Sequence, residues 1–401
     1  MSARVLITGI GSVSSIGLSI QELTESILQS KTGVSNTTRL ESILARTLPT
    51  AQIQLSDQEL KNKLSGLSPK HVYSRTALLG MLAAQEASNI AGLTSHDLIS
   101  AGLVSSSSAG GMDKGEFFYE DYLKSSTKGN LKFALTHDCG DSAEQIAALL
   151  NIQHYITTIS TACSSAANAM IHAARLIKSG MCDIVIAGGT DAICKFTING
   201  FNSLMILSDE PCQPFDKNRK GLNLGEAAGY FVLESEASVK RRGAKPLAVL
   251  SGYGNACDAY HQTASSPNGE GAYLAMMQAI KVSGYAPAEI DYINAHGTGT
   301  QNNDLSESVA LKRIFETLPP VSSTKAMTGH TLAAAGGIEA VMSVLAIQNG
   351  WIFPNKNFKD AIEETGIIPV TELQTNKSIK HILSNSFGFG GNNSSLLISA
   401  C

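Results

Sequence analysis

The sequence lacks the features that would suit it to nucleic acid or to a membrane. Of its 401 residues, 30 are Lys or Arg and 34 are Asp or Glu, which gives a formal net charge of −4. Nucleic-acid binding depends on a basic surface, so this balance argues against it. No run of about 18 consecutive apolar residues occurs, so we expect no membrane span. The N-terminus passes from Met1-Ser2-Ala3-Arg4 directly into a strand-like stretch and does not resemble a signal peptide.

Disulfide and zinc patterns are also missing. The seven cysteines are odd in number, scattered along the chain and without Cys-x-x-Cys spacing. This pattern fits a reducing cytoplasm, and we expect no metal site and no cofactor bound by the chain itself. Aromatic residues make up 6% of the chain and charged residues 16%, whereas 43% of residues are hydrophobic and 36 are glycine. Such a composition indicates a globular chain with an apolar interior and many tight turns.

What the sequence does contain is a strand–helix–strand unit around Cys163. Tyr155–Ile159 is aromatic and β-branched and predicts a strand, and 183–187 predicts the next one. Between them a helix runs to about Ile177, since Lys178 and a following glycine are typical of a helix end. Cys163 then lies where a strand passes into a helix, and the positive end of the helix dipole favours its thiolate. Most cysteines are buried structural residues, but this position indicates a nucleophile.

The rest of the N-terminal part alternates in a similar way. The pattern predicts a strand at 5–8, a structural turn at 9–14, a helix at 74–90, a strand at 98–104 and an aromatic lid or dimer arm at 110–132. The glycines of the turn resemble the start of a dinucleotide-binding fingerprint. The third glycine and the partner acid are missing, so we interpret the segment as structural.

The C-terminal part repeats this order. Its glycine-containing stretch at 250–255 echoes 7–12, and a helix rich in small residues at 332–347 follows a Ser-Thr pair, as the Cys163 helix does. We therefore predict a duplicated α/β unit with halves at 1–247 and 248–401. Because strands and helices alternate, we expect parallel sheets covered by helices.

Polar groups follow apolar strands at three places in the second half, 294–300, 323–330 and 384–393. They carry His296, Lys325 and His330. The carboxyl ends of parallel strands form ligand sites, and Cys163 falls at such an end too. A lone histidine or lysine is usually a surface or core residue. A thiol, two histidines, a lysine and glycine-rich backbone donors together suit acyl transfer through a thioester.

Five segments together resemble the β-ketoacyl-[acyl-carrier-protein] synthases of the elongating type (I/II). They occur in order over nearly the whole chain, at 160–165, 214–229, 294–304, 322–339 and 384–393. The resemblance implies a thiolase-like fold in which two pseudo-duplicated βαβαβ halves form a five-layered αβαβα sandwich. It also implies decarboxylative Claisen condensation of a cysteine-bound acyl chain with malonyl-carrier protein, in fatty acid or polyene/polyketide (type II) chain elongation.

The same resemblance implies a role for each site residue. Cys163 would accept the acyl chain, and His296 and His330 would hold the malonyl thioester carbonyl and stabilise the enolate. The backbone N–H groups of Cys163 and Phe389 would form an oxyanion hole, and Phe389 would act as a mobile gate. Lys325 would orient the histidines. The remaining implied residues are the gate glycines Gly388 and Gly390, the supporting acids Glu339, Asp304 and Glu307, and the substrate-binding residues Thr298, Thr300, Thr263 and Ala109.

The implied partner is acyl carrier protein, which carries the substrates on phosphopantetheine. Because carrier protein is acidic, a basic patch should receive it. The candidates for this patch are Lys61, Lys63, Lys70, Arg75, Arg219 and Lys220. Members of the family form homodimers or pair with a related ketosynthase or chain-length-factor subunit, and we expect one of these assemblies here.

The sequence departs from the usual elongating pattern at several positions. Gln301-Asn302 stands where Pro-Leu is common, Asn392 where threonine is common, Ala227 where glycine is common, and Ala109 where a bulkier residue is frequent. Our hypothesis is a long, rigid or aryl-capped acyl chain, as in polyene or polyketide pathways.

Other classes fit the residues less well. A non-catalytic chain-length-factor-like subunit is the alternative, but such subunits lack the nucleophile that Cys163 supplies. Initiating synthases lack the second histidine, and a cysteine hydrolase has no role for it. Thiolases use a second catalytic cysteine in the C-terminal region, where Cys401 is only the terminal residue and lies outside any glycine motif.

Overall fold

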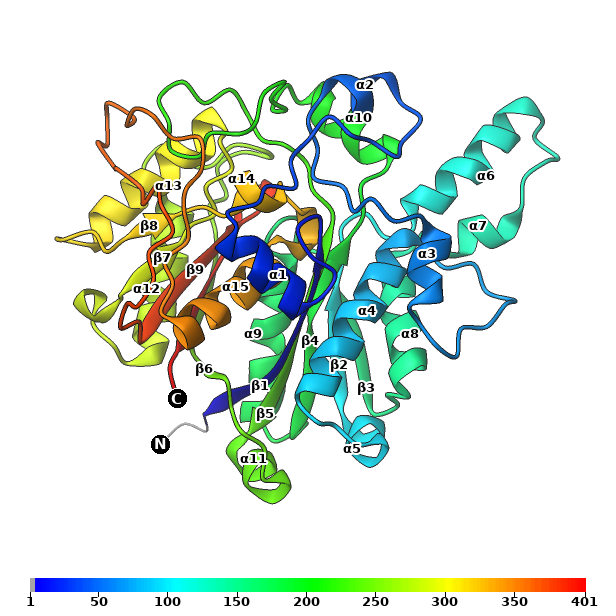
Figure 1. Ribbon diagram of the computed structural model, residues 1–401, viewed down its shortest axis with the longest axis horizontal. Helices are drawn as coiled ribbons and strands as arrows, with labels where there is room; N and C mark the ends of the chain where they lie inside the picture. Colours follow the sequence, from blue (N-terminus) through cyan, green and yellow to red (C-terminus); the bar gives the residue numbers. More distant parts are fainter. Residues whose placement is uncertain (1–3) are drawn as a thin grey trace.

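The structure, a computed structural model, describes residues 4–401 and is built on ten strands in one continuous order (Figure 1). That order is β3-β2-β4-β5-β1-β6-β10-β9-β7-β8. The strands are β1 (Val5–Ser14), β2 (Gly102–Ser106), β3 (Tyr155–Ile159), β4 (Ile184–Asp191), β5 (Ala227–Ser235), β6 (Ala248–Cys257), β7 (Tyr292–Asn294), β8 (Val321–Ser322), β9 (His381–Phe387) and β10 (Asn392–Ser399). The sequence prediction for Met1 to Ala3 lies outside the described residues.

Helices connect these strands on both sides of the sheet. The α-helices of the first half are α1 (Ile20–Leu28), α2 (Ile43–Thr47), α3 (Asp57–Asn62), α4 (Arg75–Ile90), α5 (Ser95–Ser100), α6 (Met112–Lys124), α7 (Leu131–Leu135), α8 (Cys139–Leu150), α9 (Ser165–Lys178), α10 (Lys195–Ser203) and α11 (Glu236–Arg242). The second half has α12 (Glu270–Ser283), α13 (Gln301–Ile314), α14 (Lys325–Thr328) and α15 (Ala335–Asn349), with 3-10 turns η1 (Pro287–Glu289), η2 (Leu332–Ala334) and η3 (Phe389–Gly391).

The two groups of five strands share one topology. Read from the outer edge, the first is β3-β2-β4-β5-β1 and the second is β8-β7-β9-β10-β6, so each strand matches the one five places later in the chain. In each group, the second strand in chain order is parallel to both neighbours and the remaining pairs are antiparallel. The predicted duplication is confirmed. The prediction of parallel sheets is wrong, because each group is mixed.

The layers follow from how the helices pack. α4 and α8 cover one face of the first strand group, and α9 and α15 lie between the two groups and contact each other. α12 packs on β6 and β10, and α13 packs on α12. This arrangement is the expected five-layered α/β sandwich. Within residues 4–401, the strand pairing that joins the two groups is that of β1 with β6, at Leu6–Val249 and Ile7–Ala248. The boundary between residues 247 and 248 falls at the start of β6 and stays a prediction.

The central layer is strongly apolar. In the part of the chain that the structure describes, the segment Leu332–Asn349, which contains α15, is the one helical stretch long and apolar enough to cross a membrane. It is 83% buried inside the fold. Its apolar character is therefore that of a core helix packed on both sides.

Two local predictions need correction. Residues 9–14 are not a turn but belong to β1, and their glycines let α4 lie against the strand: a Cβ at Gly9 would come within 2.1 Å of the Ala87 carbonyl oxygen. The predicted strand at 98–104 begins as α5, because Thr94 and Asp97 form a capping box, and continues as β2. The segment 110–132 contains α6 and the start of α7, which project from the body (Figure 1).

Candidate active site

The nucleophile turn is built between β3 and α9. Ala162 adopts a left-handed conformation with φ of 53°, which L-residues rarely accept. Ser165 stabilises it, since its hydroxyl accepts the Thr161 N–H at 2.8 Å and donates to the Ala162 carbonyl at 2.6 Å. This turn places Cys163 directly before the helix, with 5% of its surface exposed. The position predicted from the sequence is confirmed.

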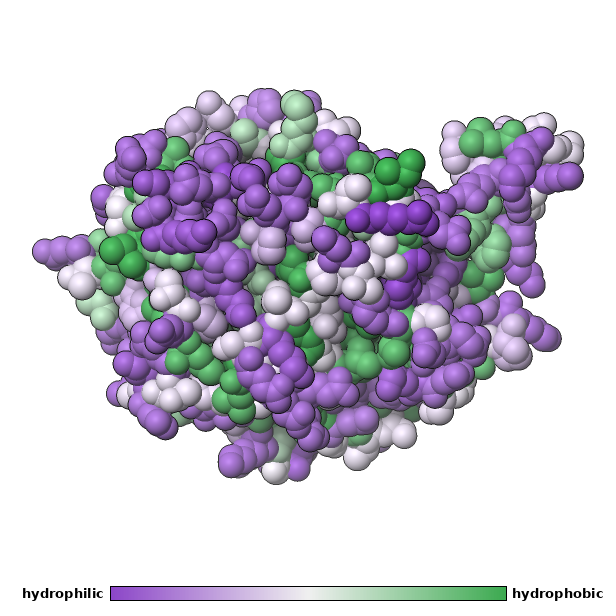
Figure 2. Space-filling view, turned by 45° about the horizontal axis from the view of Figure 1, so that its top comes forward, coloured by the Kyte–Doolittle hydropathy of each residue, from purple (hydrophilic) through white to green (hydrophobic). Residues whose placement is uncertain are grey.

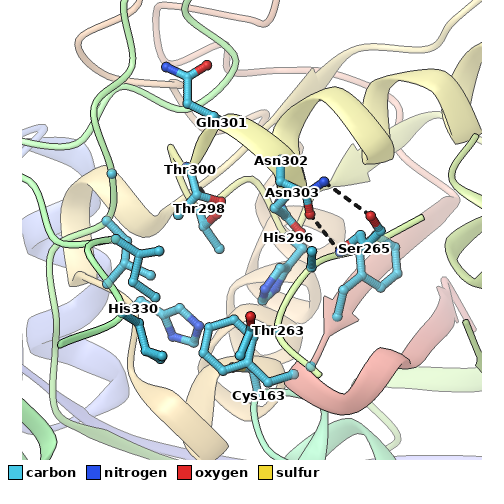
Figure 3. A pocket seen from close by; sticks show the side chains of 18 of the residues that line it. Cys163, Thr263, Ser265, His296, Thr298, Thr300, Gln301, Asn302, Asn303 and His330 are labelled. Atoms are coloured by element: carbon cyan, nitrogen blue, oxygen red, sulfur yellow. Dashed lines mark hydrogen bonds between the residues drawn. The ribbon is translucent and has the colours of Figure 1, made fainter. Parts of the chain in front are cut away.

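Cys163 lies where two cavities meet. The first, of about 250 Å³, contains both histidines and opens past Thr298, Thr300 and Thr263. Figure 3 shows the imidazoles of His296 and His330 turned toward the space beside Cys163. The second cavity, of about 330 Å³, is lined mainly by apolar groups of α6, α10 and neighbouring loops. Its lining includes Ser108, Ala109, Met112, Phe196, Phe201 and Leu332.

His296 follows β7 and is fixed by two buried charged groups. Glu307 of α13 accepts the backbone N–H groups of His296 and Gly297 at 2.9 and 2.8 Å. The Lys325 ammonium donates to the His296 carbonyl oxygen at 2.5 Å and to Glu339, and it lies 3.3 Å from His296 Nδ1. Three ammonium protons thus meet three acceptors. Because Nδ1 faces this cation as an acceptor, we assign the ring proton to Nε2.

The ring of His330 also carries its proton on Nε2, but a backbone N–H sets this tautomer in place of a lysine. The Leu332 backbone N–H donates to His330 Nδ1 at 3.1 Å, so its ring proton is also assigned to Nε2. The two rings lie 5.5 Å apart, centroid to centroid, at 90° to each other. Burial lowers the pKa of His330 to about 3, and burial with the nearby Lys325 charge lowers the pKa of His296 well below its usual value. Burial, together with the Lys325 charge, therefore keeps both rings neutral.

The electrostatics of Cys163 differ from the sequence prediction. Burial raises the pKa of its thiol to about 11, although the Lys325 charge and the Phe389 and Cys163 N–H groups act in the opposite direction. A resting thiolate near neutral pH, expected from the helix dipole alone, is therefore wrong for this state. The sulfur is predominantly a thiol near neutral pH.

The gate predicted at Phe389 lies against the nucleophile turn. The N–H groups of Phe389 and of Cys163 itself both lower the pKa of the Cys163 thiol, so they act on the sulfur from nearby. Gly388 permits this approach, because a Cβ there would lie 2.8 Å from the Thr161 carbonyl oxygen. Gly390 has φ of 81°, in the region that favours glycine. The Phe389 ring stacks on Phe201 at 5.8 Å, and both cavities share it as lining.

The polar channel is held by residues that follow His296. Thr298 and Thr300 share a hydrogen bond of 2.9 Å between their hydroxyls, and Asp304 accepts the Gly299 N–H. Asn302 binds both the N–H and the carbonyl of Ser265, at 2.6 and 3.1 Å, and so ties the loop that carries Thr263 to α13 (Figure 3). The position where the sequence departs from Pro-Leu therefore shapes the channel wall.

The prediction of a surface contact for carrier protein is wrong for two residues of the basic patch. Arg75 is 3% exposed, and its guanidinium pairs with the buried Glu226 at 2.7 Å and with Asp57 at 3.0 Å. Arg219 is equally buried and donates to the carbonyls of Thr300 and Gln301. Both arginines satisfy internal acceptors and cannot meet a partner. Lys63, Lys70 and Lys220 are exposed and Lys61 is half-buried, and Lys220 pairs with Glu210.

Sequence reasoning missed Asp191, which ends β4. Its carboxylate accepts the hydroxyls of Ser107 and Ser108 at 2.6 Å each, and the N–H groups of Ala109 and Ala333. This buried acid fixes the loop that carries Ala109 on the wall of the apolar cavity. The only sequence signal was an acid following Gly188-Gly189-Thr190 at a strand end. Within residues 4–401, no group of three or more His, Cys, Asp or Glu side chains is arranged to hold a metal ion.

Comparison with known proteins agrees with this geometry. The chain matches the family profile described as beta-ketoacyl synthase, N-terminal domain, over residues 2–238, and the corresponding C-terminal domain over 247–359. The chain belongs to the β-ketoacyl synthase family. This membership confirms the resemblance on which the site prediction depended.

Relatives in this family align over nearly the whole chain. The 3-oxoacyl-[acyl-carrier-protein] synthase 2 of Coxiella burnetii is 34% identical over 410 residues, which covers 99% of this chain and 98% of that protein. The enzyme of the same name from Staphylococcus aureus strain N315 is 33% identical over 408 residues, with 98% and 97% covered.

Solved ketosynthases share the fold. The ishigamide ketosynthase/chain length factor superposes with a TM-score of 0.94 at 30% identity over the whole of both chains. A ketosynthase (ApeO) in complex with its chain length factor (ApeC) from Xenorhabdus doucetiae gives 0.87 at 28% identity and covers 100% of this chain and 98% of that chain. The predicted thiolase-like ketosynthase fold is confirmed.

Proposed function

We propose that this protein is a β-ketoacyl-acyl-carrier-protein synthase that extends a Cys163-bound acyl chain by decarboxylative condensation with malonyl-carrier protein. One observation carries the proposal. Two neutral imidazoles, each with its proton assigned to Nε2, line the same cavity as the sulfur of a strand-to-helix cysteine. Cysteine chemistry alone needs one histidine at most, so the second donor supports a reaction that develops a further oxyanion.

The first step in this proposal is acyl transfer. The Cys163 sulfur attacks the thioester carbonyl carbon of acyl-carrier protein, and a tetrahedral intermediate forms. Its oxyanion accepts hydrogen bonds from the N–H groups of Cys163 and Phe389, and the effect of both groups on the pKa of Cys163 supports this role. The C–S bond to phosphopantetheine breaks, and the leaving thiolate takes the proton that Cys163 loses.

The second step is decarboxylation followed by condensation. The malonyl thioester carbonyl accepts the Nε2–H groups of His296 and His330. The bond to the carboxylate carbon breaks, carbon dioxide leaves, and the electron pair forms an enolate whose oxygen the two imidazoles stabilise. The enolate carbon attacks the acyl carbonyl on Cys163, and the cysteine thiolate departs. Lys325 holds the His296 ring, and Glu339 neutralises Lys325.

The substrates arrive on carrier protein through the polar channel. Thr298, Thr300 and Thr263 offer hydroxyls to a phosphopantetheine arm along the channel of the first cavity. Lys61, Lys63, Lys70 and Lys220 remain as contacts for the acidic carrier protein. The seven cysteines are free thiols, which fits a reducing compartment, so we place this activity in the cytoplasm.

A dimer completes the proposal, with an identical chain or a related subunit as partner. In the described part of the chain, β3 is an edge strand, and its outer backbone groups have no neighbour in the sheet. The nearby arm of α6 and α7, which projects at the upper right of Figure 2, exposes large apolar and aromatic side chains. They are Phe117, Tyr119, Tyr122, Leu123, Leu131 and Leu135. The ApeO–ApeC pair and the ishigamide protein are assemblies with a chain length factor.

The apolar cavity supports a long acyl chain, of the polyene or polyketide kind that we expect from the sequence. It continues from Cys163 past the small side chain of Ala109 to Met112, and the aromatic rings of Phe196 and Phe201 form another wall. A series of acyl-carrier proteins with saturated, polyene and aryl-capped chains tests this substrate class. Exclusive use of short saturated chains would refute the proposed substrate class. The variant Ala109→Phe should shorten the longest acyl chain that the enzyme accepts.

Intact-mass spectrometry tests the activity itself. The wild-type chain mixed with acyl-carrier protein should gain an acyl adduct at Cys163, and addition of malonyl-carrier protein should transfer that chain to a longer β-ketoacyl product. Cys163→Ala should show no adduct. A non-catalytic partner subunit would show neither adduct nor product, and a hydrolase would release free acid without a condensed product.

A further inference from the structure

The side chain of Asn392 joins the gate loop to the nucleophile turn. Its Oδ1 accepts hydrogen bonds from three donors, each at 2.8 Å: Ser164 Oγ, Asn168 Nδ2 and Asn255 Nδ2. Ser164 directly follows Cys163, Asn168 lies one turn further along α9, and Asn255 comes from β6. One amide oxygen thus connects the start of the catalytic helix α9 to strand β6 of the other half by hydrogen bonds.

The backbone of Asn392 closes the gate loop. The Gly388 N–H donates to the Asn392 carbonyl at 2.8 Å, so residues 388–392 form a loop pinched at its base. Phe389, whose N–H lowers the pKa of the Cys163 sulfur, lies inside this loop, and a Cβ at the adjacent Gly388 would lie 3.3 Å from the Cys163 backbone N. Movement of Asn392 relative to Ser164 would therefore change the position of the Phe389 N–H relative to that sulfur.

Surrounding groups fix the orientation of the Asn392 amide. Asn168 Oδ1 accepts hydrogen bonds from Asn255 Nδ2 at 3.0 Å and from Ser394 Oγ at 2.9 Å. These bonds fix the Asn168 amide, so that the NH₂ groups of Asn168 and Asn255 both face Asn392. Turning the Asn392 amide would bring its own NH₂ against these donors. Only the oxygen of Asn392 is used in the network, and the side chain is half-buried.

Ser164 makes the connection adjustable. Its single hydroxyl proton has two good acceptors, the Thr161 carbonyl at 2.7 Å and Asn392 Oδ1 at 2.8 Å. A hydroxyl donates only one hydrogen bond at a time. Rotation of this hydroxyl therefore releases only the Ser164 contact, because Asn168 and Asn255 keep their hydrogen bonds to Asn392 Oδ1.

We propose that Asn392 is a positioning residue that holds the Phe389 loop against the Cys163 turn and so keeps the two N–H groups of the acyl-transfer oxyanion hole aligned. This inference rests on the proposed function. It assigns Asn392, where threonine is common among elongating synthases, to acyl transfer and not to decarboxylation, because the malonyl carbonyl is held by the histidines on another wall.

Two rates measured on the full-length enzyme test this assignment. The first is single-turnover acylation of Cys163 by acyl-carrier protein, followed by intact mass. The second is carbon dioxide release from malonyl-carrier protein without an acyl donor. We expect Asn392→Ala to slow acylation by about tenfold to a hundredfold, below the cost of losing one oxyanion donor outright, and to leave decarboxylation within about twofold. Asn392→Asp, which keeps the accepting oxygen, should acylate near the wild-type rate.

Several outcomes would overturn the inference. Acylation of Asn392→Ala at the wild-type rate would do so, as would an equal loss of both rates with a lowered Tm. If Asn392→Ala does not fold, Asn392→Leu has a similar volume without the acceptor and is measured in its place against the same two criteria. A wild-type enzyme that neither gains an adduct nor decarboxylates contradicts the proposed function itself, whereas an active wild type with an unaffected Asn392→Ala contradicts only this inference.

Discussion

Lys325 Nζ lies 3.3 Å from His296 Nδ1 while it also binds the carbonyl oxygen of the same histidine and the carboxylate of Glu339. One buried ammonium thus sets both the position and the tautomer of the ring. The consequence is a neutral imidazole with its Nε2–H free for a substrate oxygen, next to a second ring fixed in the same state by a backbone N–H.

Removal of the ammonium should impair decarboxylation more than acylation. In Lys325→Met, His296 can place its proton on either nitrogen, and we expect malonyl decarboxylation to fall by about 10²-fold, the cost of one oxyanion donor. Carbon dioxide release and Cys163 acylation are measured in parallel. Glu339→Gln is the matched control, since it keeps Lys325 and a hydrogen-bond acceptor and should lose much less. Equal rates in Lys325→Met and wild type would contradict the role of Lys325.

The reactivity of Cys163 toward a small alkylating reagent should rise with pH well beyond neutrality. Its pKa is raised to about 11, so the thiolate fraction, and with it the rate of alkylation by iodoacetamide, increases about tenfold per pH unit up to that range. Peptide mass spectrometry follows Cys163, with the exposed Cys257 as an internal reference for the reagent. Lys325→Met should react more slowly at each pH, because a charge that lowers the pKa is lost. A rate that levels off near pH 8 is incompatible with this account.

Alanine should slow acylation more at Gly388 than at Gly390, the two glycines of the gate. Gly388→Ala would place a Cβ 2.8 Å from the Thr161 carbonyl oxygen and push the Phe389 N–H away from the sulfur. We expect acylation to fall by about 10²-fold. Gly390→Ala adds a Cβ with no atom within 4 Å and suffers only the strain of φ at 81°. Its acylation rate should be much closer to wild type, and a reversed order of the two variants would speak against the close approach of gate and turn.

The basic residues should divide into structural and partner-binding groups. Arg75→Ala leaves Glu226 buried without its closest cation, and loss of one partner of a buried pair costs about 3–5 kcal/mol. We expect a lowered Tm and denaturation midpoint. Lys63→Ala should leave Tm unchanged and raise KM for acyl-carrier protein, most clearly at low salt. Unfolding curves and steady-state kinetics separate the two, and an unchanged Tm in Arg75→Ala would be inconsistent with the buried pair.

Much of the fold and site was predictable because local chemistry and global topology agree. The β-branched run before Cys163, the small residues after it and the polar segments after β7, β8 and β9 placed each site residue at a strand end. The duplication was visible in the repeated order of glycine-rich strands and small-residue helices. It was then confirmed strand by strand.

The rest depended on long-range contacts that a linear pattern does not contain. Gly9 and Gly11 serve the packing of α4 on β1, and a turn would have had the same local signature. From the sequence, Arg75 and Arg219 resemble surface cations, but in the fold both are buried and bind acceptors that are distant in the chain. The Cys163 pKa depends on how deeply the sulfur is covered, which opposes the helix dipole predicted from position alone.

The central claim is that two neutral imidazoles and one cysteine divide the reaction between them. Intact-mass analysis of His330→Ala with acyl- and malonyl-carrier proteins tests it most directly. The account predicts a full acyl adduct on Cys163, unconsumed malonyl-carrier protein and no condensed product. Normal yields of β-ketoacyl product from that variant would contradict it.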